Sequence, residues 1–183
     1  MSRIYTKTGD DGSTGLFLGG RVSKGDELVD AYGDVDETVA LLGVARAACV
    51  QPQLADLLLR LQRELFVVAA DLAANPDRRD RLTSRVSLVT PAMISGLEEV
   101  IDHLVTERPL RPVFVVPGAT AAGAAIDHAR TVARRAERHV VRAEGHGHAV
   151  SRDALRYLNR LSDLLFVLAR HAAGDVEEPA SKE

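Results

Sequence analysis

Six glycines and two lysines stand among the first 25 residues, where they alternate with serine, threonine and aspartate. Glycine leaves backbone N–H groups accessible, and these donors together with hydroxyl and ammonium groups can bind a polyphosphate. Neither common phosphate motif, G-x-x-x-x-G-K-[ST] or G-x-G-x-x-G, occurs in this segment. The segment is therefore a candidate polyphosphate loop that leads from a short extended piece expected at Arg3–Lys7, and a flexible N-terminal arm is the alternative. Its lysines and glycines are Lys7, Lys24, Gly9, Gly12, Gly15, Gly19, Gly20 and Gly25.

A strip of charged residues is expected on a later helix. Arg130, Arg134, Glu137 and Arg138 stand at positions i, i+4, i+7 and i+8, which share one helix face. Guanidinium groups on one strip repel each other unless an anion or a carboxylate lies across them, and Glu137 can offset one. The strip is a candidate anion site, with a solvated charged face as the alternative.

A second polar line follows near the C-terminus. Asn159, Asp163, Phe166 and Arg170 have helical spacing, and Arg160 stands three residues before Asp163, as an ion pair requires. No serine or cysteine nucleophile has a recognisable motif around it, and no histidines have close metal-binding spacing. Anion-binding groups without an evident base or nucleophile suit positioning and electrostatic stabilisation better than acid–base catalysis.

The composition indicates which kind of protein must position these groups. A length of 183 residues suggests one domain, and hydrophobic residues at 46% with only 4% aromatics favour a helical core of Ala, Leu and Val. A net charge of −3 argues against nucleic acid as the main partner. The single cysteine excludes an internal disulfide and a cysteine-cluster metal site. Without an apolar leader or a long apolar run, we expect a cytoplasmic protein with no membrane partner.

Hydrophobic periodicity predicts an all-α, up-and-down bundle of five helices that follows the N-terminal Gly-rich segment, the candidate nucleotide-binding loop. A polar, arginine-rich segment at 77–89 is expected to be a mobile connection, and a short extended piece is expected at 113–116. We predict one domain over residues 1–183, made of the loop at 1–25, the bundle at 26–174 and a frayed tail at 175–183. The five predicted helices occupy residues 26–49, 52–72, 93–106, 120–144 and 151–173.

Three segments together resemble one family, the PduO-type ATP:cob(I)alamin adenosyltransferases. Residues 4–14 (IYTKTGDDGST) are similar to the ATP loop of that family, 129–138 (ARTVARRAER) to its R-R-A-E-R helix, and 158–163 (LNRLSD) to its N-R-L-S-D helix. Weaker matches at 31–37 and 114–118 keep the same order. The resemblance runs from about residue 3 to residue 173, although residues 75–95 match nothing distinctive.

The resemblance implies a homotrimer of five-helix bundles with ATP and Mg²⁺ at each subunit interface, the Mg²⁺ being held mainly by the ATP phosphates. It implies that a loop and Lys24 wrap the triphosphate, and that arginines and a glutamate of the neighbouring subunit complete the nucleotide site together with Asn159. The implied loop residues are Thr6, Lys7, Thr8, Gly9, Asp10, Asp11, Gly12, Ser13, Thr14 and Gly15, and those of the neighbour are Arg134, Arg135, Glu137 and Arg138.

The same resemblance assigns three residues to catalysis. Asp36 and Arg130 match an ion pair between subunits, and Phe114 matches an aromatic residue under the lower face of the corrin. The implied reaction transfers the 5′-deoxyadenosyl group of ATP to the cobalt of reduced cob(I)alamin, or of cob(I)yrinic acid a,c-diamide, and releases triphosphate. A reductase and an adenosylcobalamin-dependent mutase are the implied partners.

Two other functions remain open from the residues alone. One is a non-catalytic chaperone or sensor that binds ATP or a corrinoid, and the other is a helical scaffold whose arginine strip binds a protein. The Gly-rich segment argues against the scaffold, which has no need of six glycines and two lysines there. Phe114 has an alternative of its own, because a Pro-bracketed apolar segment can also supply an ordinary core residue.

Overall fold

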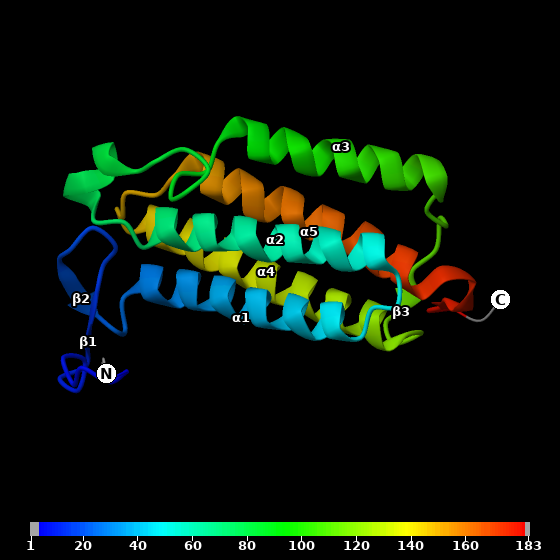
Figure 1. The fold of residues 1–183 in the computed structure, drawn as a ribbon, viewed down its shortest axis with the longest axis horizontal. Helices are drawn as coiled ribbons and strands as arrows, with labels where there is room; N and C mark the ends of the chain where they lie inside the picture. The colour runs from blue at the N-terminus through cyan, green and yellow to red at the C-terminus, as the bar shows by residue number, and fades with distance from the viewer. Residues whose placement is uncertain (1–3, 182–183) are drawn as a thin grey trace.

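The computed structural model describes residues 4–181 and consists mainly of five long helices (Figure 1). Successive helices run in opposite directions along one long axis, so the predicted all-α, up-and-down five-helix bundle is confirmed. Every predicted helix boundary lies within two residues of the observed one. No helix in this described part of the chain is long and apolar enough to cross a membrane. The helices are α1 (Glu27–Ala47), α2 (Pro52–Leu72), α3 (Pro91–Glu107), α4 (Ala121–Gly145) and α5 (Arg152–Ala173).

Side chains and prolines at the N-terminal ends explain where these helices begin. The side chain of Asp26 accepts a hydrogen bond of 2.9 Å from the backbone N–H of the residue two positions later. Thr120 and Ser151 accept bonds of 3.0 and 3.2 Å from the backbone N–H groups three positions later. Pro52 and Pro91 stand at the first position of α2 and α3, where a missing N–H costs nothing.

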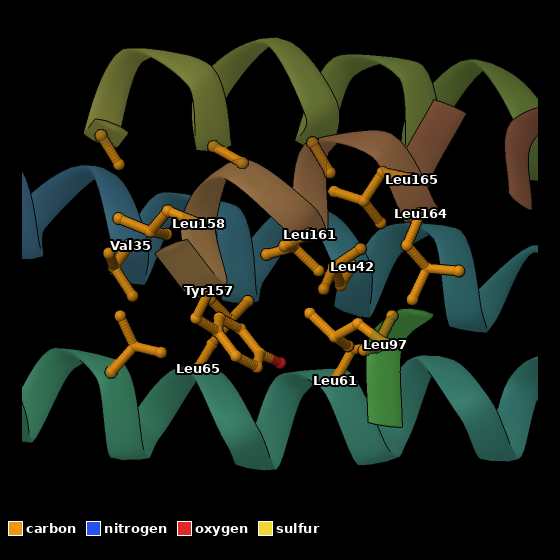
Figure 2. Packing of buried hydrophobic residues seen from close by; sticks show 14 of the residues in the cluster. Val35, Leu42, Leu61, Leu65, Leu97, Tyr157, Leu158, Leu161, Leu164 and Leu165 are labelled. Atoms are coloured by element: carbon orange, nitrogen blue, oxygen red, sulfur yellow. The ribbon is translucent and has the colours of Figure 1, made fainter. Parts of the chain in front are cut away.

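The core lies along the centre of the bundle and consists largely of leucine and alanine (Figure 2). Leu42, Leu61 and Leu161 are fully buried there. Tyr157 is also fully buried and donates a hydrogen bond of 2.7 Å to Glu64. Burial, followed by the nearby Glu64 charge, raises the pKa of the Tyr157 hydroxyl well above its ordinary value. The phenol therefore stays neutral and remains a donor.

The Gly-rich segment is folded into an antiparallel hairpin, which we call the N-terminal hairpin (residues 13–23). Its strands are β1 (Ser13–Gly15) and β2 (Arg21–Ser23), with Thr14 opposite Val22. Sequence reasoning predicted a loop preceded by an extended piece from Arg3 to Lys7. Arg3 is outside the described residues, and Lys7 has a φ of 61°, which is left-handed rather than extended. The part of the expected loop that lacks regular structure is thus confined mainly to residues 4–12.

The connection between α2 and α3 is also more regular than expected. It contains the 3-10 helix η1 (Pro76–Arg81), where sequence reasoning predicted a mobile segment at 77–89. Asp71 is fully buried at the end of α2, forms an ion pair with Arg79 and accepts a 2.9 Å hydrogen bond from the N–H of Val89. One buried carboxylate therefore holds the connection at two points, in η1 and directly before α3.

The C-terminal tail, expected to be frayed from residue 175, is folded as far as the structure describes it. A 3-10 turn, η2 (Gly174–Val176), leads into β4 (Glu178–Pro179), which pairs antiparallel with β3 (Val115–Val116). The pairing joins segments more than 60 residues apart in sequence. Such backbone pairing leaves no local pattern, which explains why the sequence did not predict it.

Candidate active site

Two cations, one at the start of β2 (Arg21) and one directly after it (Lys24), contact the candidate phosphate loop (residues 6–15). The Nζ of Lys24 donates to the carbonyl oxygen of Gly9 at 2.8 Å. The Nε of Arg21 donates to the hydroxyl of Ser13 at 2.9 Å, and its guanidinium also contacts the carbonyl of Thr8. Arg21 is absent from the residues predicted for this site, although its place in a Gly-rich segment was a usable signal. The side chains of Arg21 and Lys24 thus hold the backbone and a hydroxyl group of the loop.

Asp11 closes the turn that leads into β1. Its carboxylate accepts hydrogen bonds from the hydroxyl of Ser13 at 2.7 Å and from the backbone N–H of the same residue at 2.9 Å. These hydrogen bonds lower the pKa of the exposed Asp11 carboxyl. At neutral pH the group is ionised and serves as an acceptor within the loop.

The predicted charged strip on α4 is present and faces solvent beside α5. Arg134 and Arg138 are exposed, and Arg138 donates to the carbonyl oxygen of Arg134 at 3.0 Å. Glu137 accepts a hydrogen bond of 2.8 Å from the side-chain amide of Asn159, so these two predicted residues meet across the two helices. An open cavity of about 570 Å³ lies beside that pair and is also bordered by Arg160, whose expected ion pair with Asp163 is formed at 2.7 Å.

Arg135 lies on a different face from the rest of the strip. Its Nε is 2.9 Å from Asp34 of α1, and its guanidinium also pairs with Glu37. The hydrogen bond that Arg135 donates to the Asp34 carboxylate raises the pKa of the Arg135 guanidinium. Because adjacent helix residues point about 100° apart, the single-residue step from Arg134 could have indicated this separation. Within one subunit, two carboxylates of α1 already neutralise Arg135.

The structure does not bring Asp36 and Arg130 together within one subunit. Asp36 is exposed on α1, whereas the Nε of Arg130 is 3.1 Å from Asp127, one turn earlier on α4. An ion pair between Asp36 and Arg130 would therefore need two subunits. Asp127 was not among the predicted residues, although its i, i+3 spacing to Arg130 was visible in the sequence.

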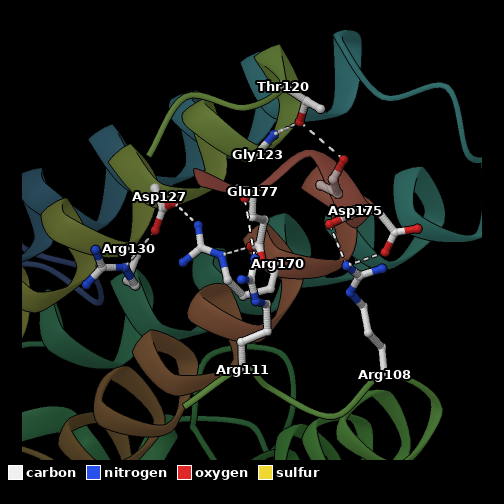
Figure 3. A network of polar contacts seen from close by, with 11 residues as sticks. Arg108, Arg111, Thr120, Gly123, Asp127, Arg130, Arg170, Asp175 and Glu177 are labelled. Carbon is white, nitrogen blue, oxygen red and sulfur yellow. Dashed lines mark hydrogen bonds and ion pairs between the residues drawn. The ribbon is translucent and has the colours of Figure 1, made fainter. Parts of the chain in front are cut away.

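A buried ion cluster extends from Arg130 toward the C-terminal tail (Figure 3). Asp127 pairs with Arg170 of α5 as well as with Arg130, and Arg170 in turn pairs with Glu177 of the tail. The guanidinium of Arg170 also lies 5.0 Å from the centre of the Phe166 ring. Sequence reasoning grouped Arg170 with a polar line on α5, and the structure shows that it is buried and joins α4, α5 and the tail.

Phe114 stands directly before β3 at the same end of the bundle. Its side chain is 91% exposed, which excludes the alternative that it is a core residue of its own subunit. Its carbonyl oxygen accepts a hydrogen bond of 2.8 Å from the backbone N–H of Ala180, so the tail fixes the backbone on which the ring stands. The ring is therefore accessible to a ligand or a partner.

The two candidate ligand contacts lie at opposite ends of one chain. Figure 1 shows the N-terminal hairpin beyond the start of α1 and β3 beyond the other end of the bundle. A 21-residue helix such as α1 spans about 31 Å at the usual rise per residue. Within one chain, the candidate phosphate loop and Phe114 are therefore separated by about the length of the bundle.

Comparisons with known proteins agree over almost the whole chain. Residues 4–172 match the family model for cobalamin adenosyltransferase. The chain is 42% identical over 170 residues to a corrinoid adenosyltransferase of Citrobacter freundii, covering 93% of this chain and 94% of the relative. It is 44% identical over 175 residues to one of Mycobacterium leprae, covering 94% of this chain and 92% of the relative.

Solved structures of PduO-type ATP:corrinoid adenosyltransferase from Lactobacillus reuteri have the same fold. One is a variant with a phenylalanine replaced by alanine, complexed with cobalamin and ATP, at a TM-score of 0.83 and 34% identity over 93% of both chains. Another is a variant with an arginine replaced by lysine, complexed with ATP, at a TM-score of 0.84 and 31% identity over 99% of this chain and 100% of the other.

Proposed function

This chain belongs to the cobalamin adenosyltransferase family, and from that premise we infer how it adenosylates a reduced corrinoid with ATP. The observation that carries the function is the match over residues 4–172, which includes the phosphate loop, the strip on α4 and Phe114. The reaction forms a bond between cobalt and the 5′-carbon of ATP and releases triphosphate. Cobalamin and its a,c-diamide precursor are both proposed substrates.

The residues present suit this chemistry because cob(I)alamin is itself a strong nucleophile. Attack on the 5′-carbon requires no protein base, so the protein must hold the two substrates in line and neutralise the leaving triphosphate. We assign the second task to the loop residues 6–15 with Lys24 from one subunit and to Arg134 and Arg138 from its neighbour. The pair of Glu137 and Asn159 is proposed to contact the nucleotide beside them, with Mg²⁺ held mainly by the phosphates.

The separation of the two ligand contacts supports a site between subunits. We propose a homotrimer in which the phosphate loop of one subunit faces α4 and Phe114 of the next. In this arrangement Asp36 would find Arg130 across the interface, and the ion pairs of Arg135 with α1 would support the nucleotide site without touching ATP. A cytoplasmic location, a reductase that supplies Co(I) and a mutase that receives the product belong to the same proposal.

Visible spectroscopy tests the function directly. The protein is mixed with MgATP and cobalamin under a strong reductant, and conversion to the spectrum of an alkylcobalamin is expected only when ATP is present. ATP binding without any spectral conversion would instead identify a non-catalytic ATP or corrinoid chaperone. This alternative also predicts that the corrinoid is recovered chemically unchanged.

Removing either loop lysine is expected to weaken ATP binding at least as strongly as it slows turnover. A charge-assisted contact to phosphate contributes roughly 1.5–3 kcal/mol, so Lys7→Ala and Lys24→Ala should each raise the KM for ATP at least about tenfold. Lys182→Ala is the matched control, because Lys182 is the remaining lysine of the chain. Unchanged ATP binding in both loop variants, measured by calorimetry, would mean that the loop does not contact the phosphates.

A double-mutant cycle tests the ion pair between subunits. Asp36→Asn and Arg130→Ala are expected to lose activity non-additively, with a coupling energy of about 0.5–3 kcal/mol for residues in contact. A parallel cycle on Arg130 and Asp127, which are 3.1 Å apart within one subunit, gives the coupling of a known pair. Additive losses in the first cycle alongside coupling in the second would rule out the interface contact.

A further inference from the structure

The turn of the N-terminal hairpin lies on the chain that follows α2, a segment we call the α2-end platform (residues 73–78). Two backbone hydrogen bonds of 2.9 Å join them, one from the N–H of Phe17 to the carbonyl of Ala73 and one from the N–H of Asn75 to the carbonyl of Phe17. Residues 75–78 of the platform belong to the stretch of the sequence that matched no motif. The hairpin is thus attached to the bundle at a second point besides its covalent link to α1.

Two side chains of the platform hold the tip of the turn. The Nδ2 of Asn75 donates to the carbonyl oxygen of Gly19, and the Nη1 of Arg78 donates to that of Leu18, both at 2.8 Å. A Cβ atom at Gly20 would lie 3.0 Å from the Asn75 amide, and one at Gly19 would lie 3.2 Å from the Arg78 guanidinium. The two platform side chains are therefore packed directly against the backbone of the turn.

The conformation of the turn explains why it needs these partners. Leu18 has a φ of 67°, and the two glycines after it have φ values of 93° and 91°. A left-handed leucine costs on the order of 1 kcal/mol, and consecutive left-handed residues are unusual, so the turn is not stable through local preference. Hydrogen bonds from outside the hairpin offset this cost.

The platform is itself fixed and cannot follow a moving hairpin. The side-chain oxygen of Asn75 caps η1 by accepting from the N–H of Asp77 at 3.0 Å. One residue beyond Arg78, Arg79 pairs with the buried carboxylate of Asp71 and donates to its carbonyl oxygen at 2.9 Å. The donors of Asn75 and Arg78 are consequently anchored to the end of α2.

We propose that Asn75 and Arg78 are positioning residues that orient the ATP loop through the hairpin without contacting ATP. A turn that is held in place also fixes the three residue pairs of β1 and β2. The strands in turn fix the position of Lys24, which contacts the loop at the opposite end of the hairpin. An oriented loop loses less conformational freedom when the triphosphate binds, which strengthens ATP binding. The inference rests on the proposed role of the loop as the ATP site.

The test compares Arg78→Ala and Asn75→Ala with Arg81→Ala, which removes an exposed arginine of the same 3-10 helix. Loss of one hydrogen bond to the turn is expected to raise the KM for ATP roughly 3- to 10-fold, with kcat at saturating ATP and the KM for cobalamin unchanged. Arg78→Lys, which keeps one donor, should restore part of the affinity. Arg81→Ala should behave as the unmodified protein.

Limited trypsin digestion provides a readout independent of activity. Without ligand, Arg78→Ala should be cleaved faster at Lys7, Arg21 and Lys24 than the unmodified protein, and saturating MgATP should abolish the difference. Equal cleavage rates and equal ATP affinity in the two proteins would overturn the positioning role. Failure of the unmodified protein to bind MgATP in calorimetry would instead refute the ATP loop itself, so the two failures are distinguishable.

Discussion

Phe114→Ala is expected to lose most of its activity when the reaction starts from Co(II)alamin and a mild reductant, and much less when Co(I) is formed chemically beforehand. We propose that the ring of Phe114 occupies the lower face of the corrin and keeps a lower ligand away from cobalt. The electron pair of a lower ligand favours Co(II) over Co(I), so its exclusion makes the reduction accessible. A loss of at least about tenfold in the first assay corresponds to about 1.4 kcal/mol.

The exposure of Phe114 makes this result interpretable. A buried phenylalanine replaced by alanine costs roughly 3–5 kcal/mol of stability, whereas the ring of Phe114 is 91% exposed. The variant should therefore melt at the same temperature as the unmodified protein and bind ATP almost as well. Val50→Ala, which removes an apolar side chain that is 93% exposed, is the matched control. Early melting together with equal losses in both assays would contradict the role under cobalt.

Lysine in place of Arg134 or Arg138 is expected to reduce kcat/KM for ATP at least about tenfold in each variant. Lysine keeps the positive charge but loses the planar fork that donates two parallel hydrogen bonds to a phosphate. Both arginines are exposed within their own subunit, so the substitution should not unfold the bundle.

Arg142→Lys is the control for those two variants, because Arg142 is an exposed arginine in the last turn of the same helix. It should keep full activity. If Arg134→Lys and Arg138→Lys also kept full activity, the strip on α4 would be a solvated charged face and not part of the ATP site. Circular dichroism of the three variants checks that helix content is unchanged.

The parts of the structure that the sequence predicted are those with a local physical signal. Helical spacing of Leu54, Leu58, Leu61 and Leu65 placed α2, and the i, i+3 spacing of Arg160 and Asp163 predicted an ion pair that the structure contains. Pro52 and Pro91 stand at the first positions of α2 and α3, where proline is a local signal for a helix start. Each of these signals acts within one or two turns of the chain.

The features that were missed depend on contacts between distant segments. Leu18 is left-handed in a turn that Asn75 and Arg78 stabilise, and no propensity of residues 16–20 predicts that partnership. Glu177 looks like a solvated tail residue until Arg170 is known to be buried beside it. Candidate site residues such as Phe114 were identified by resemblance, and their contacts with substrates remain predictions.

Because the bundle is long, mutations at one of its ends and mutations in its core are expected to differ in their genetic consequences. The hairpin lies at one end of the bundle, and β3, which Phe114 directly precedes, lies at the other. In the proposed trimer, a chain defective in its hairpin would still offer an intact Phe114 end to a neighbour, and the reverse would also hold. Two alleles that are each inactive alone are then expected to complement one another in a mixed trimer, because some interfaces would join the two undamaged ends. A mutation that unfolds the leucine core is not expected to be complemented in this way, because it disrupts both ends of the same chain.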